Sequence, residues 1–390
     1  MNAFVNQSYS VAIIGGGAVG YSCAIALAQE GHHTVILTGR ETPQDAGRTA
    51  ALLNGSLEFL YSLGIENAVM AQSWPLCTMR IIDVKGSMVR APTAIFRATE
   101  IGKPEFGRNI SNAKLVEILK EKAQKTPNLD VLDVKVKSTD FFDNDVQVFT
   151  EDGHVVTCSA VIAADGRKSP TREAVGIPTR RWSHEQCALT FHVRHTKDHE
   201  DISTEFHTNE GPFTLVPLGE YLSSVVWMVK PETAQRLKAL TSEALAQAAE
   251  RQCQSILGAF TLDGCVGEWP LSSLVAQRFY APRLALIGEA AHAFPPIGAQ
   301  GLNLGLRDAA VLAKLAVGAD ISSPDILKRY DSNRRLDVET RSLAVDVFNR
   351  SILSSFLPVN MARSVAFGAM NRINPLRKFM MKMGLGQAAL

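Results

Sequence analysis

The alternation of apolar and polar positions predicts one strand–helix–strand unit at the start of the chain. An apolar run at 10–14 predicts a short buried strand, and small and apolar residues at 21–29 predict a helix that ends at Gly31. A second β-rich run follows at 34–38. Two strands joined by a helix form a βαβ unit, so we expect a parallel sheet packed against helices.

Farther along, the pattern predicts that this arrangement is interrupted and later resumed. An amphipathic helix is expected at 114–125, where Pro127 ends it, and a polar helix is expected at about 232–257. Strand-like runs lie between these helices and after the second one, at 131–136, 146–150, 155–164, 213–218, 223–229 and 284–287. A helix at 302–317 follows the last of them. This order predicts a nucleotide-binding domain that a sheet domain interrupts.

Composition places the chain among ordinary globular proteins. Its 390 residues exceed what one simple core holds, so two or three packing units are expected. Forty basic and thirty-nine acidic side chains leave a net charge of +1, which gives no reason to expect a nucleic-acid partner. The six cysteines are scattered without a C-x-x-C pair, which favours reduced thiols in a cytoplasmic protein over a zinc site. No apolar run approaches the ~18 residues that a membrane-spanning helix needs.

The first chemistry-bearing segment is the turn Gly15-x-Gly17-x-x-Gly20, between the first strand and the first helix. Gly15 permits a tight turn, Gly17 lets the backbone approach a pyrophosphate, and Gly20 lets the helix pack close to the strand. Ala18 and Val19 open the helix, whose free N–H groups and partial positive charge suit phosphate oxygens. This setting favours dinucleotide binding over a plain tight turn.

The second strand departs from the pattern of dinucleotide-binding folds. An acid is expected about 20 residues after the glycines, at the end of this strand, where it binds a ribose hydroxyl. Thr38 occupies that position and is followed by Gly39 and Arg40. A threonine hydroxyl also forms hydrogen bonds, although weaker ones than a carboxylate.

A second strand-end motif runs from Val161 to Ser169 and places Asp165 and Gly166 directly after a buried run. Ligands of such sheets bind beyond the carboxyl ends of the strands, so Asp165 is a candidate for the cofactor crevice. The alternative is that Asp165 only caps the next turn. The motif alone does not decide between these two roles.

The third motif, from Gly288 to Asn303, is the most specific of the three. A strand again ends in a glycine and a carboxylate, Glu289, which has the chemistry to accept hydrogen bonds from a polyol chain. Gly298 and Gly301 allow close backbone approach at the start of a helix, whose N-terminus stabilises negative charge on a ring system. The three strand ends suit a nucleotide, a polyol and a ring that becomes anionic, which describes FAD better than NAD.

Together these motifs resemble those of the group A flavoprotein monooxygenases, which share the para-hydroxybenzoate hydroxylase fold, and most of all the ubiquinone-biosynthesis hydroxylases. The resemblance covers almost the whole chain. It implies FAD as cofactor, NAD(P)H as electron donor, and an arginine at position 48 that reaches the FAD pyrophosphate, although spacing alone would make Arg48 a surface residue. The predicted cofactor contacts are Gly15, Gly17, Ala18, Val19, Gly20, Thr38, Arg40, Arg48, Asn112, Val136, Asp165, Gly166, Gly288, Glu289, Pro296, Gly298, Gly301, Leu302 and Asn303.

Two positions depart from the family pattern. The family's aspartate in the third motif is Glu289 here, one methylene longer, and Thr38 replaces the acid that holds the adenosine ribose. Both changes are expected to weaken FAD binding, so we expect a protein that is partly flavin-free after purification. His292 is expected to pack beside the flavin loop with a backbone hydrogen bond, rather than to act in acid–base catalysis.

The resemblance implies an α/β fold, with a Rossmann-like FAD-binding domain, an inserted and mostly antiparallel β-sheet substrate domain, and a C-terminal helical tail. We assign 1–70, 105–180 and 270–345 to the FAD-binding domain. Residues 71–104 and 181–269 are assigned to the substrate domain, and 346–390 to the tail.

The reaction that the resemblance implies is hydroxylation of an electron-rich phenolic ring. Hydride passes from NAD(P)H to FAD, reduced flavin reacts with O2, and the resulting C4a-hydroperoxide delivers oxygen to the ring. The protein positions the ring and excludes water, and no side chain is required as a nucleophile. The implied substrate is a polyprenyl phenol of ubiquinone biosynthesis. The alternatives are a small soluble aromatic compound as substrate, or a flavin-binding scaffold subunit of a biosynthetic complex.

The last 40 residues, 351–390, contain no acidic residue and carry five positive charges. Apolar residues in this tail recur at helical spacing, at Leu376, Phe379, Met380 and Met383. Three interpretations stay open: a helical layer packed on the flavin domain, a basic amphipathic helix on the inner-membrane surface, and a docking face for proteins of a ubiquinone-biosynthesis complex. The protein is therefore expected in the cytoplasm, with the tail as its candidate peripheral attachment to the membrane.

Overall fold

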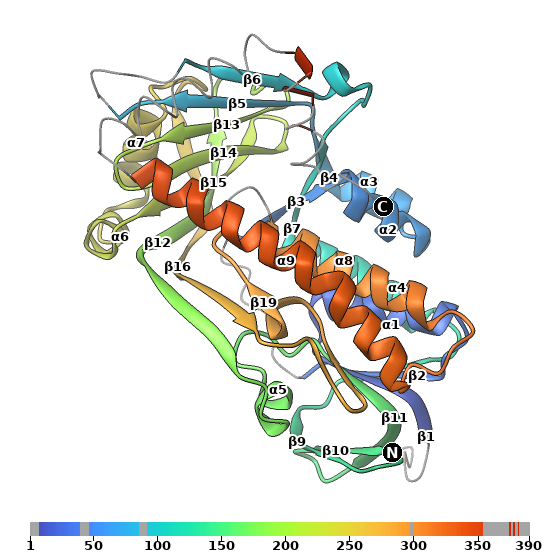
Figure 1. Cartoon of the computed structure of the whole chain (residues 1–390). Helices are drawn as coiled ribbons and strands as arrows, with labels where there is room; N and C mark the ends of the chain where they lie inside the picture. The colour runs from blue at the N-terminus through green and yellow to red at the C-terminus, as the bar shows by residue number, and fades with distance from the viewer. Residues whose placement is uncertain are drawn as a thin grey trace.

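The computed structural model describes residues 8–39, 47–85, 92–296 and 300–353, together with 374–375, 377–378 and 381. Two large sheets dominate it, one above the other in Figure 1. Helix α9 (Pro324–Leu353) runs diagonally past both of them. The mixed α/β fold class that the sequence predicts is confirmed.

The lower sheet is the predicted parallel sheet. Its main path, in spatial order, consists of β17 (Tyr280–Ala281), β18 (Leu284–Leu286), β11 (Val155–Ala163), β1 (Ser8–Ile14), β2 (Thr34–Leu37) and β8 (Leu129–Leu132). All neighbours from β18 to β8 are parallel, and β2 and β18 are buried along their whole length. Strands covered on both faces read as continuous apolar runs, which is why the sequence revealed them. β10 (Val146–Thr150) and β9 (Val136–Phe141) extend β11 in antiparallel fashion.

Helix α1 (Ala18–Gln29) packs against α4 (Asn112–Gln124) and α8 (Gln300–Ala316). α1 is buried from residue 20 to 28 because it has neighbours on several sides, whereas α4 buries only one stripe of its surface. Shorter helices complete this part of the molecule: α2 (Asn54–Ser62), α3 (Glu66–Gln72), α5 (Pro170–Ala174) and the 3₁₀ turn η2 (Gly288–Ala290).

The upper sheet is antiparallel except at one pair of strands. Its spatial order is β19 (His292–Ala293), β16 (Phe260–Ala276), β12 (Thr179–His195), β15 (Leu222–Val229), β14 (Pro212–Gly219), β13 (Ile202–His207), β5 (Thr78–Asp83) and β6 (Ala94–Arg97). Only β13 and β5 run parallel. The predicted mostly antiparallel sheet is therefore confirmed.

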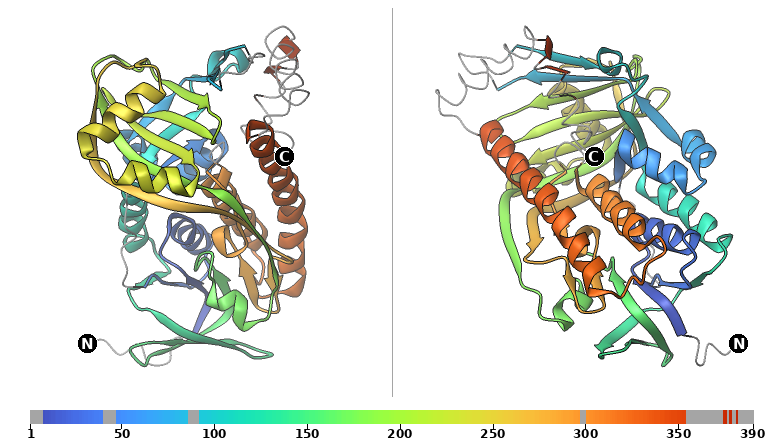
Figure 2. Two further views of the ribbon diagram at one scale, coloured as in Figure 1. Left: turned by 90° about the vertical axis from the view of Figure 1, so that its left-hand side faces the viewer. Right: turned by 45° about the vertical axis from the view of Figure 1, so that its right-hand side comes forward.

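Two helices, α6 (Pro231–Lys238) and α7 (Ser242–Gln252), cover one face of the upper sheet (Figure 2). The sequence predicted one helix at 232–257, and this was wrong. The first helix ends at the C-cap Ala239, and the side chain of Thr241 then accepts a hydrogen bond from the N–H of Ala244 and starts the second helix.

β12 and β16, each 17 residues long, run from the upper sheet down toward the lower one (Figure 2). The expected domain boundaries at 180/181 and 269/270 both fall inside these strands, and α9 continues through 345/346. A third, small sheet of β3 (Thr49–Leu53), β7 (Gly107–Ser111) and β4 (Ser73–Leu76) lies beside them. The predicted run at 131–136 is divided, because β8 ends at Leu132 and β9 begins at Val136.

The described tail residues beyond α9 pack beside β6 at the edge of the upper sheet, where residues of both assigned domains meet. Met381 joins a small apolar cluster with Ala98 and Phe106, next to the 3₁₀ helix η1 (Ala98–Ile101). The Arg377 guanidinium forms a bidentate pair with Glu100, with N···O distances of 2.6 and 2.9 Å. The predicted apolar stripe of the tail lies outside the described residues. Among the helices that are described, none is both long and apolar enough to cross a bilayer.

Candidate functional site

The three chemistry-bearing motifs lie at one edge of the lower sheet. The first follows β1, the second follows β11 and the third follows β18, and these strands are parallel neighbours in the order β18-β11-β1. Backbone hydrogen bonds continue past the strands, from the N–H of Ala164 to Ile14 (2.8 Å) and from the N–H of Ile287 to Ala163 (3.0 Å). The topology therefore brings the three motifs together, as expected of a ligand site beyond the carboxyl ends of parallel strands.

Two glycines of the first motif are required by contacts with the backbone. Gly15 has a φ of +125°, and a Cβ there would lie 2.2 Å from the carbonyl oxygen of Ala164. A Cβ at Gly20 would lie 2.0 Å from the carbonyl oxygen of Gly15. Both distances are shorter than real Cβ atoms show. Helix α1 can therefore lie this close to the strand ends only because positions 15 and 20 carry no side chain.

Gly17 differs from these two because its Cβ position is open. A Cβ at Gly17 would meet no atom within 4 Å, and Gly17 is the N-cap of α1 without any side-chain hydrogen bond to the first turn. The first turn of α1, which contains the predicted contacts Ala18 and Val19, therefore presents N–H groups to an open space. This arrangement fits an anionic pyrophosphate.

Asp165 performs the capping role and retains a free oxygen. Its Oδ2 accepts a hydrogen bond from the N–H of Thr171 at 3.1 Å. Its Oδ1 is buried and has no partner among the described residues, and the same holds for Oδ1 of the predicted contact Asn112 at the start of α4. Buried oxygens normally find partners, so these two acceptors fit a site that receives a polar ligand. Gly166, which follows, has a φ of +84°.

Arg172 joins the second motif to the third. Its side chain is fully buried and donates to the carbonyl oxygens of Ala290 (2.7 Å) and Arg167 (3.0 Å), and burial lowers its pKa. Arg167 in turn pairs with Glu289, with Nε and Oε2 3.3 Å apart. The carboxylate that departs from the family pattern therefore has a cationic partner from the second motif.

The third motif rests on a buried ion cluster around Asp308 of α8. Oδ2 of Asp308 accepts from the N–H of Gly288 (2.9 Å) and contacts Nε2 of His292 (2.7 Å), while Oδ1 accepts from Nε of Arg334 (2.7 Å). Burial alone would raise the pKa of Asp308, but the charges of His292 and Arg334 outweigh it and hold the pKa below its ordinary value. The predicted backbone hydrogen bond of His292 is therefore corrected: its partner is the Asp308 carboxylate.

The cluster extends along α9 to the start of α8. Asp337 accepts from the guanidinium groups of Arg334, Arg307 and Arg341, at 2.7, 2.8 and 2.7 Å. Arg341 also donates to Oε1 of Gln300, the first residue of α8, at 3.1 Å. Sequence reasoning missed this cluster, since charges three and four residues apart on a helix usually indicate a solvated face.

Gly305 is a second missed residue. A Cβ there would lie 2.7 Å from Cγ2 of Val19 and 3.1 Å from Cα of Gly288, so a side chain at this position would force α8 or the first and third motifs to shift. The sequence carried one signal that helix α8 packs closely against another element, because a second glycine, Gly301, lies four residues before Gly305. A Cβ at Gly301 would itself meet nothing within 4 Å.

Other predicted contacts have partners inside the protein. The Asn303 amide donates to Ala51 (2.8 Å) and accepts from the N–H of Leu53 (2.9 Å), so it fastens α8 to β3. The Arg48 guanidinium lies over the ring of Trp269, 4.8 Å from its centroid. A cofactor contact of either side chain stays a prediction.

Of the six remaining predicted contacts, four lie within the described residues and two lie outside them. Thr38 follows β2 and donates to Oδ1 of Asp133 at 3.1 Å. Val136 begins β9 and lies opposite Thr150. Pro296 is exposed, and Leu302 is half-buried in the first turn of α8. Arg40 and Gly298 lie outside the described residues.

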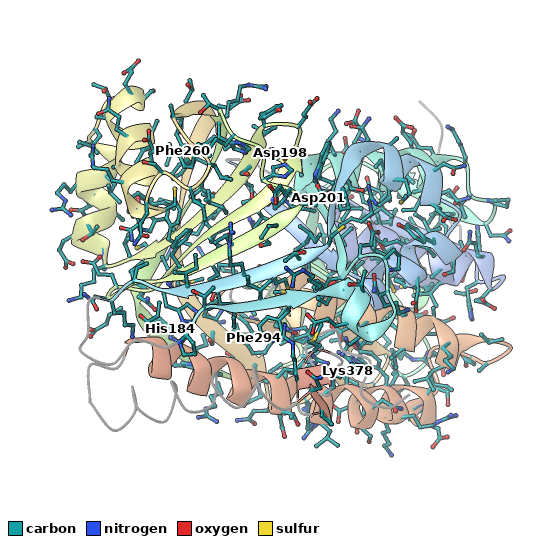
Figure 3. All side chains as sticks on the ribbon, turned by 90° about the horizontal axis from the view of Figure 1, so that it is seen from above. His184, Asp198, Asp201, Phe260, Phe294 and Lys378 are labelled. Carbon is teal, nitrogen blue, oxygen red and sulfur yellow. The ribbon has the colours of Figure 1, made fainter. Side chains whose placement is uncertain are left out.

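The inner face of the upper sheet turns toward the lower domain. Ser224 of β15 contacts Thr49 of β3 (2.8 Å), and Val226 and Met228 follow Ser224 on the same face because strand side chains alternate. Trp269 shares this face and donates to Thr190 at 2.9 Å. In Figure 3 the labelled Phe294 and Lys378 lie on the same side of the sheet as α9, and Phe260 lies on the opposite side. The face is mainly apolar, with Arg48 over Trp269 as a cation on it.

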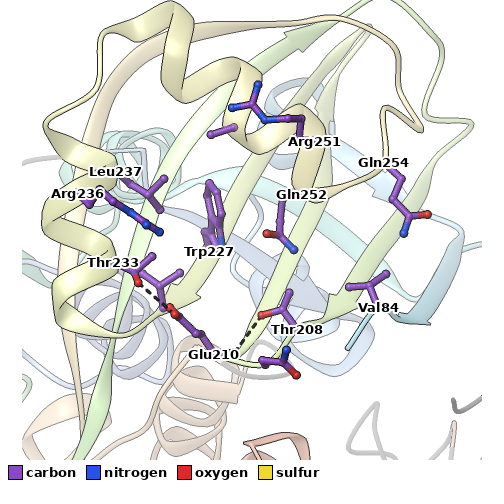
Figure 4. Close-up of a pocket in the computed structure, with 13 residues that line it drawn as sticks. Val84, Thr208, Glu210, Trp227, Thr233, Arg236, Leu237, Arg251, Gln252 and Gln254 are labelled. Atoms are coloured by element: carbon purple, nitrogen blue, oxygen red, sulfur yellow. Dashed lines mark hydrogen bonds between the residues drawn. The ribbon is translucent and has the colours of Figure 1, made fainter. Parts of the chain in front are cut away.

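The outer face of the upper sheet carries a separate hollow of about 550 Å³ (Figure 4). Trp227 stands in it, between α6, α7 and the strands, and the carboxylate of Glu210 accepts from Thr233 at 3.2 Å on its wall. None of its lining residues belongs to the three motifs, so the hollow is distinct from the cofactor site.

Comparisons with known proteins show the family of the chain. Residues 8–342 match the FAD binding domain family. The chain is 31% identical over 392 residues to ubiquinone hydroxylase UbiL of Rhodospirillum rubrum, covering 97% of this chain and 90% of that protein. It is 27% identical over 394 residues to 3-demethoxyubiquinol 3-hydroxylase of Escherichia coli, covering 98% and 99%.

A solved structure agrees in fold at lower identity. The p-nitrophenol 4-monooxygenase PnpA of Pseudomonas putida superposes with a TM-score of 0.81 at 18% identity, over 99% of this chain and 100% of that one. By its match over residues 8–342 the chain belongs to the FAD-binding domain family, and its relatives over almost the whole chain include ubiquinone hydroxylases.

Proposed function

We propose that this chain hydroxylates the phenolic ring of a polyprenyl intermediate of ubiquinone biosynthesis, using FAD, NAD(P)H and O2. The observation that carries the proposal is the meeting of three strand-end motifs at one sheet edge, beneath an apolar sheet face, in a relative of the ubiquinone hydroxylases. Bound FAD supplies hydride acceptance and the activation of O2. The residues of the chain supply binding, orientation and exclusion of water.

We propose a separate role in cofactor binding for each of the three motifs. The first turn of α1 binds the pyrophosphate with its N–H groups, and Oδ1 of Asp165 accepts a hydrogen bond from the cofactor. Glu289 accepts hydrogen bonds from the polyol chain after its ion pair with Arg167 opens. Asp308 positions this motif by holding the N–H of Gly288 and the ring of His292.

The proposed substrate site is the apolar inner face of the upper sheet. Ala188, Met228 and Leu271 form a buried cluster there, with Val226 and Trp269 packed against it. An apolar surface suits a ring with an isoprenoid tail, and it protects an oxygen-transfer step from water. A small aromatic acid would instead need a dedicated cation, for which Arg48 is the candidate on this face.

A spectrum of the purified protein tests the cofactor, and an oxidation assay tests the substrate. We expect the absorption of oxidised flavin, bleached by NAD(P)H, and NAD(P)H oxidation that a polyprenyl phenol stimulates. Equal stimulation by a small aromatic acid would favour the soluble-substrate alternative, and no stimulation by either would favour a scaffold subunit. Lipid extracts of a deletion strain should accumulate the quinone precursor that the enzyme consumes.

We further propose that the tail attaches the enzyme to the membrane surface or to a biosynthetic complex, in addition to packing on the body. Support comes from its five positive charges without an acidic residue, and from the exposure of Lys378 beside the buried Arg377. Co-sedimentation with anionic vesicles, lost at high salt, is the expected result. No sedimentation at low salt, with either anionic or neutral vesicles, would contradict the membrane attachment.

A further inference from the structure

The end of β2 lacks the acid that dinucleotide-binding folds use to hold a ribose. Thr38 stands there, and its hydroxyl is a weaker acceptor than a carboxylate. The neighbouring strand β8 runs parallel to β2, with Leu132 opposite Leu37. Its carboxyl end therefore lies at the same edge of the sheet, one strand farther from the glycine turn.

Pairing between these two chain segments continues beyond the strands. The N–H of Thr38 donates to the carbonyl of Leu132 (3.0 Å), and the N–H of Gly39 donates to that of Val134 (3.1 Å). Asp133 lies between these two acceptors, directly beside Thr38. The Thr38 hydroxyl donates to Oδ1 of Asp133 at 3.1 Å, across 95 residues of sequence.

This pair borders the phosphate-binding turn. A Cβ at Gly16 would lie 2.8 Å from Cβ of Thr38, so the threonine packs directly against the turn. Burial raises the pKa of the Tyr21 phenol in the first turns of α1, a hydrogen bond with Thr38 lowers it and the charge of Asp133 raises it, so Tyr21 lies close to the same pair. The carboxylate thus lies beside the two elements that frame the pyrophosphate end.

We propose that Asp133 supplies, from β8, the carboxylate that binds the adenosine ribose hydroxyls of FAD, with Thr38 as its hydrogen-bonded partner. The Thr38 hydroxyl donates a hydrogen bond to Oδ1, and its oxygen is also able to accept one from a ribose hydroxyl. Asp133 is exposed, and its Oδ2 makes no hydrogen bond within the described residues. By contrast, Asp130 on the same strand already accepts from the Tyr9 hydroxyl at 2.8 Å. The pair offsets the missing acid at position 38, so FAD affinity is not lost at this end.

Titration of the apoprotein with FAD, followed by flavin fluorescence, tests the assignment without any turnover. Asp133→Asn should raise the Kd about tenfold, equivalent to about 1.4 kcal/mol. With an FAD analogue whose adenosine ribose lacks both hydroxyls, the wild type and Asp133→Asn should bind equally, within about twofold. Asp140→Asn, an exposed aspartate of β9, is the matched control and should leave both Kd values unchanged.

A second pair of variants keeps the test decisive. Thr38→Glu in the Asp133→Asn background should restore tight binding of FAD and not of the analogue, because the acid returns to its usual strand. Equal FAD affinity of the wild type and Asp133→Asn would overturn the proposal. A loss of affinity in Asp133→Asn that is the same for FAD and the analogue would overturn it too. So would a tenfold loss of FAD affinity in Glu41→Gln, which changes the acid three residues after Thr38, if Asp133→Asn showed no such loss.

Discussion

The two ends of the candidate cofactor site are built by different physical means: one is the glycine turn, where we expect the pyrophosphate, and the other is the third motif, where we expect the ring. At the pyrophosphate end, Gly15 and Gly20 let backbone atoms approach one another where no side chain fits. At the ring end, the backbone of Gly288 is held by Asp308, whose charge is balanced by His292 and Arg334. The first end depends on steric contacts of the glycine turn with itself and with the end of β11, and the second depends on charged and polar groups from three separate segments.

This difference determines which substitutions should disrupt the structure at each end. A steric site has no tolerance for a larger residue, because the obstacle is backbone that cannot move aside. An ionic site fails when one partner is removed, because the remaining charges stay buried without compensation. The variants below separate these two kinds of failure.

The largest effect is expected at Gly15. Gly15→Ala places a Cβ 2.2 Å from the Ala164 carbonyl at a φ of +125°, so the unfolding free energy should fall by roughly 5 kcal/mol, at the exceptional end for one substitution. Urea unfolding measured by circular dichroism would show it. A variant as stable as the wild type would mean that the turn is not held by this contact.

The next effect is expected in the ion cluster. Asp308→Ala removes the partner of the buried Arg334 guanidinium, of the His292 ring and of the Gly288 N–H, and should cost about 3–5 kcal/mol of unfolding free energy. Glu339→Gln, an exposed acid on α9, serves as the control and should change little. If both variants unfold at the wild-type urea concentration, the cluster does not stabilise the ring end.

A smaller and more selective effect is expected at Gly17. Gly17→Ala meets no atom within 4 Å, so the folded protein should keep its thermal midpoint without flavin. The added methyl group lies where we expect the pyrophosphate, and the FAD Kd should rise at least about tenfold, or ~1.4 kcal/mol. Unchanged FAD affinity would place the phosphate elsewhere.

The smallest effect is expected in the tail, outside both ends. Arg377→Ala removes the pair with Glu100 and the stacking on Phe96, worth about 1 kcal/mol. Amide hydrogen exchange at 97–102 should quicken, whereas Lys378→Ala at the neighbouring exposed position should leave it unchanged. Identical exchange in both variants would show that the pair does not hold the tail.

The contrast between the two ends also explains what the sequence could reveal. The glycine turn, Asp165 and the third motif are short, continuous patterns in which each residue type has a local reason. Asp308 and Arg334 lie 26 residues apart, on helices where isolated charges suggest solvent. The bond between Thr38 and Asp133 joins residues 95 apart and depends on strand order.

The difference between short continuous patterns and long-range contacts also explains which parts of the fold the sequence predicted. Apolar runs revealed the buried strands of the lower sheet, but the long strands β12 and β16 have mixed burial along their 17 residues and show no single period. The break between α6 and α7 depends on one capping threonine, Thr241, inside an otherwise helical pattern.

A crystal structure of the protein with FAD bound would show whether the three motifs form one cofactor site. We expect one continuous FAD molecule along the edge formed by β18, β11 and β1, with Gly17, Asp165 and Glu289 all in contact with it. An FAD that touches only one of these three residues, or that binds on another face of the molecule, would contradict this expectation.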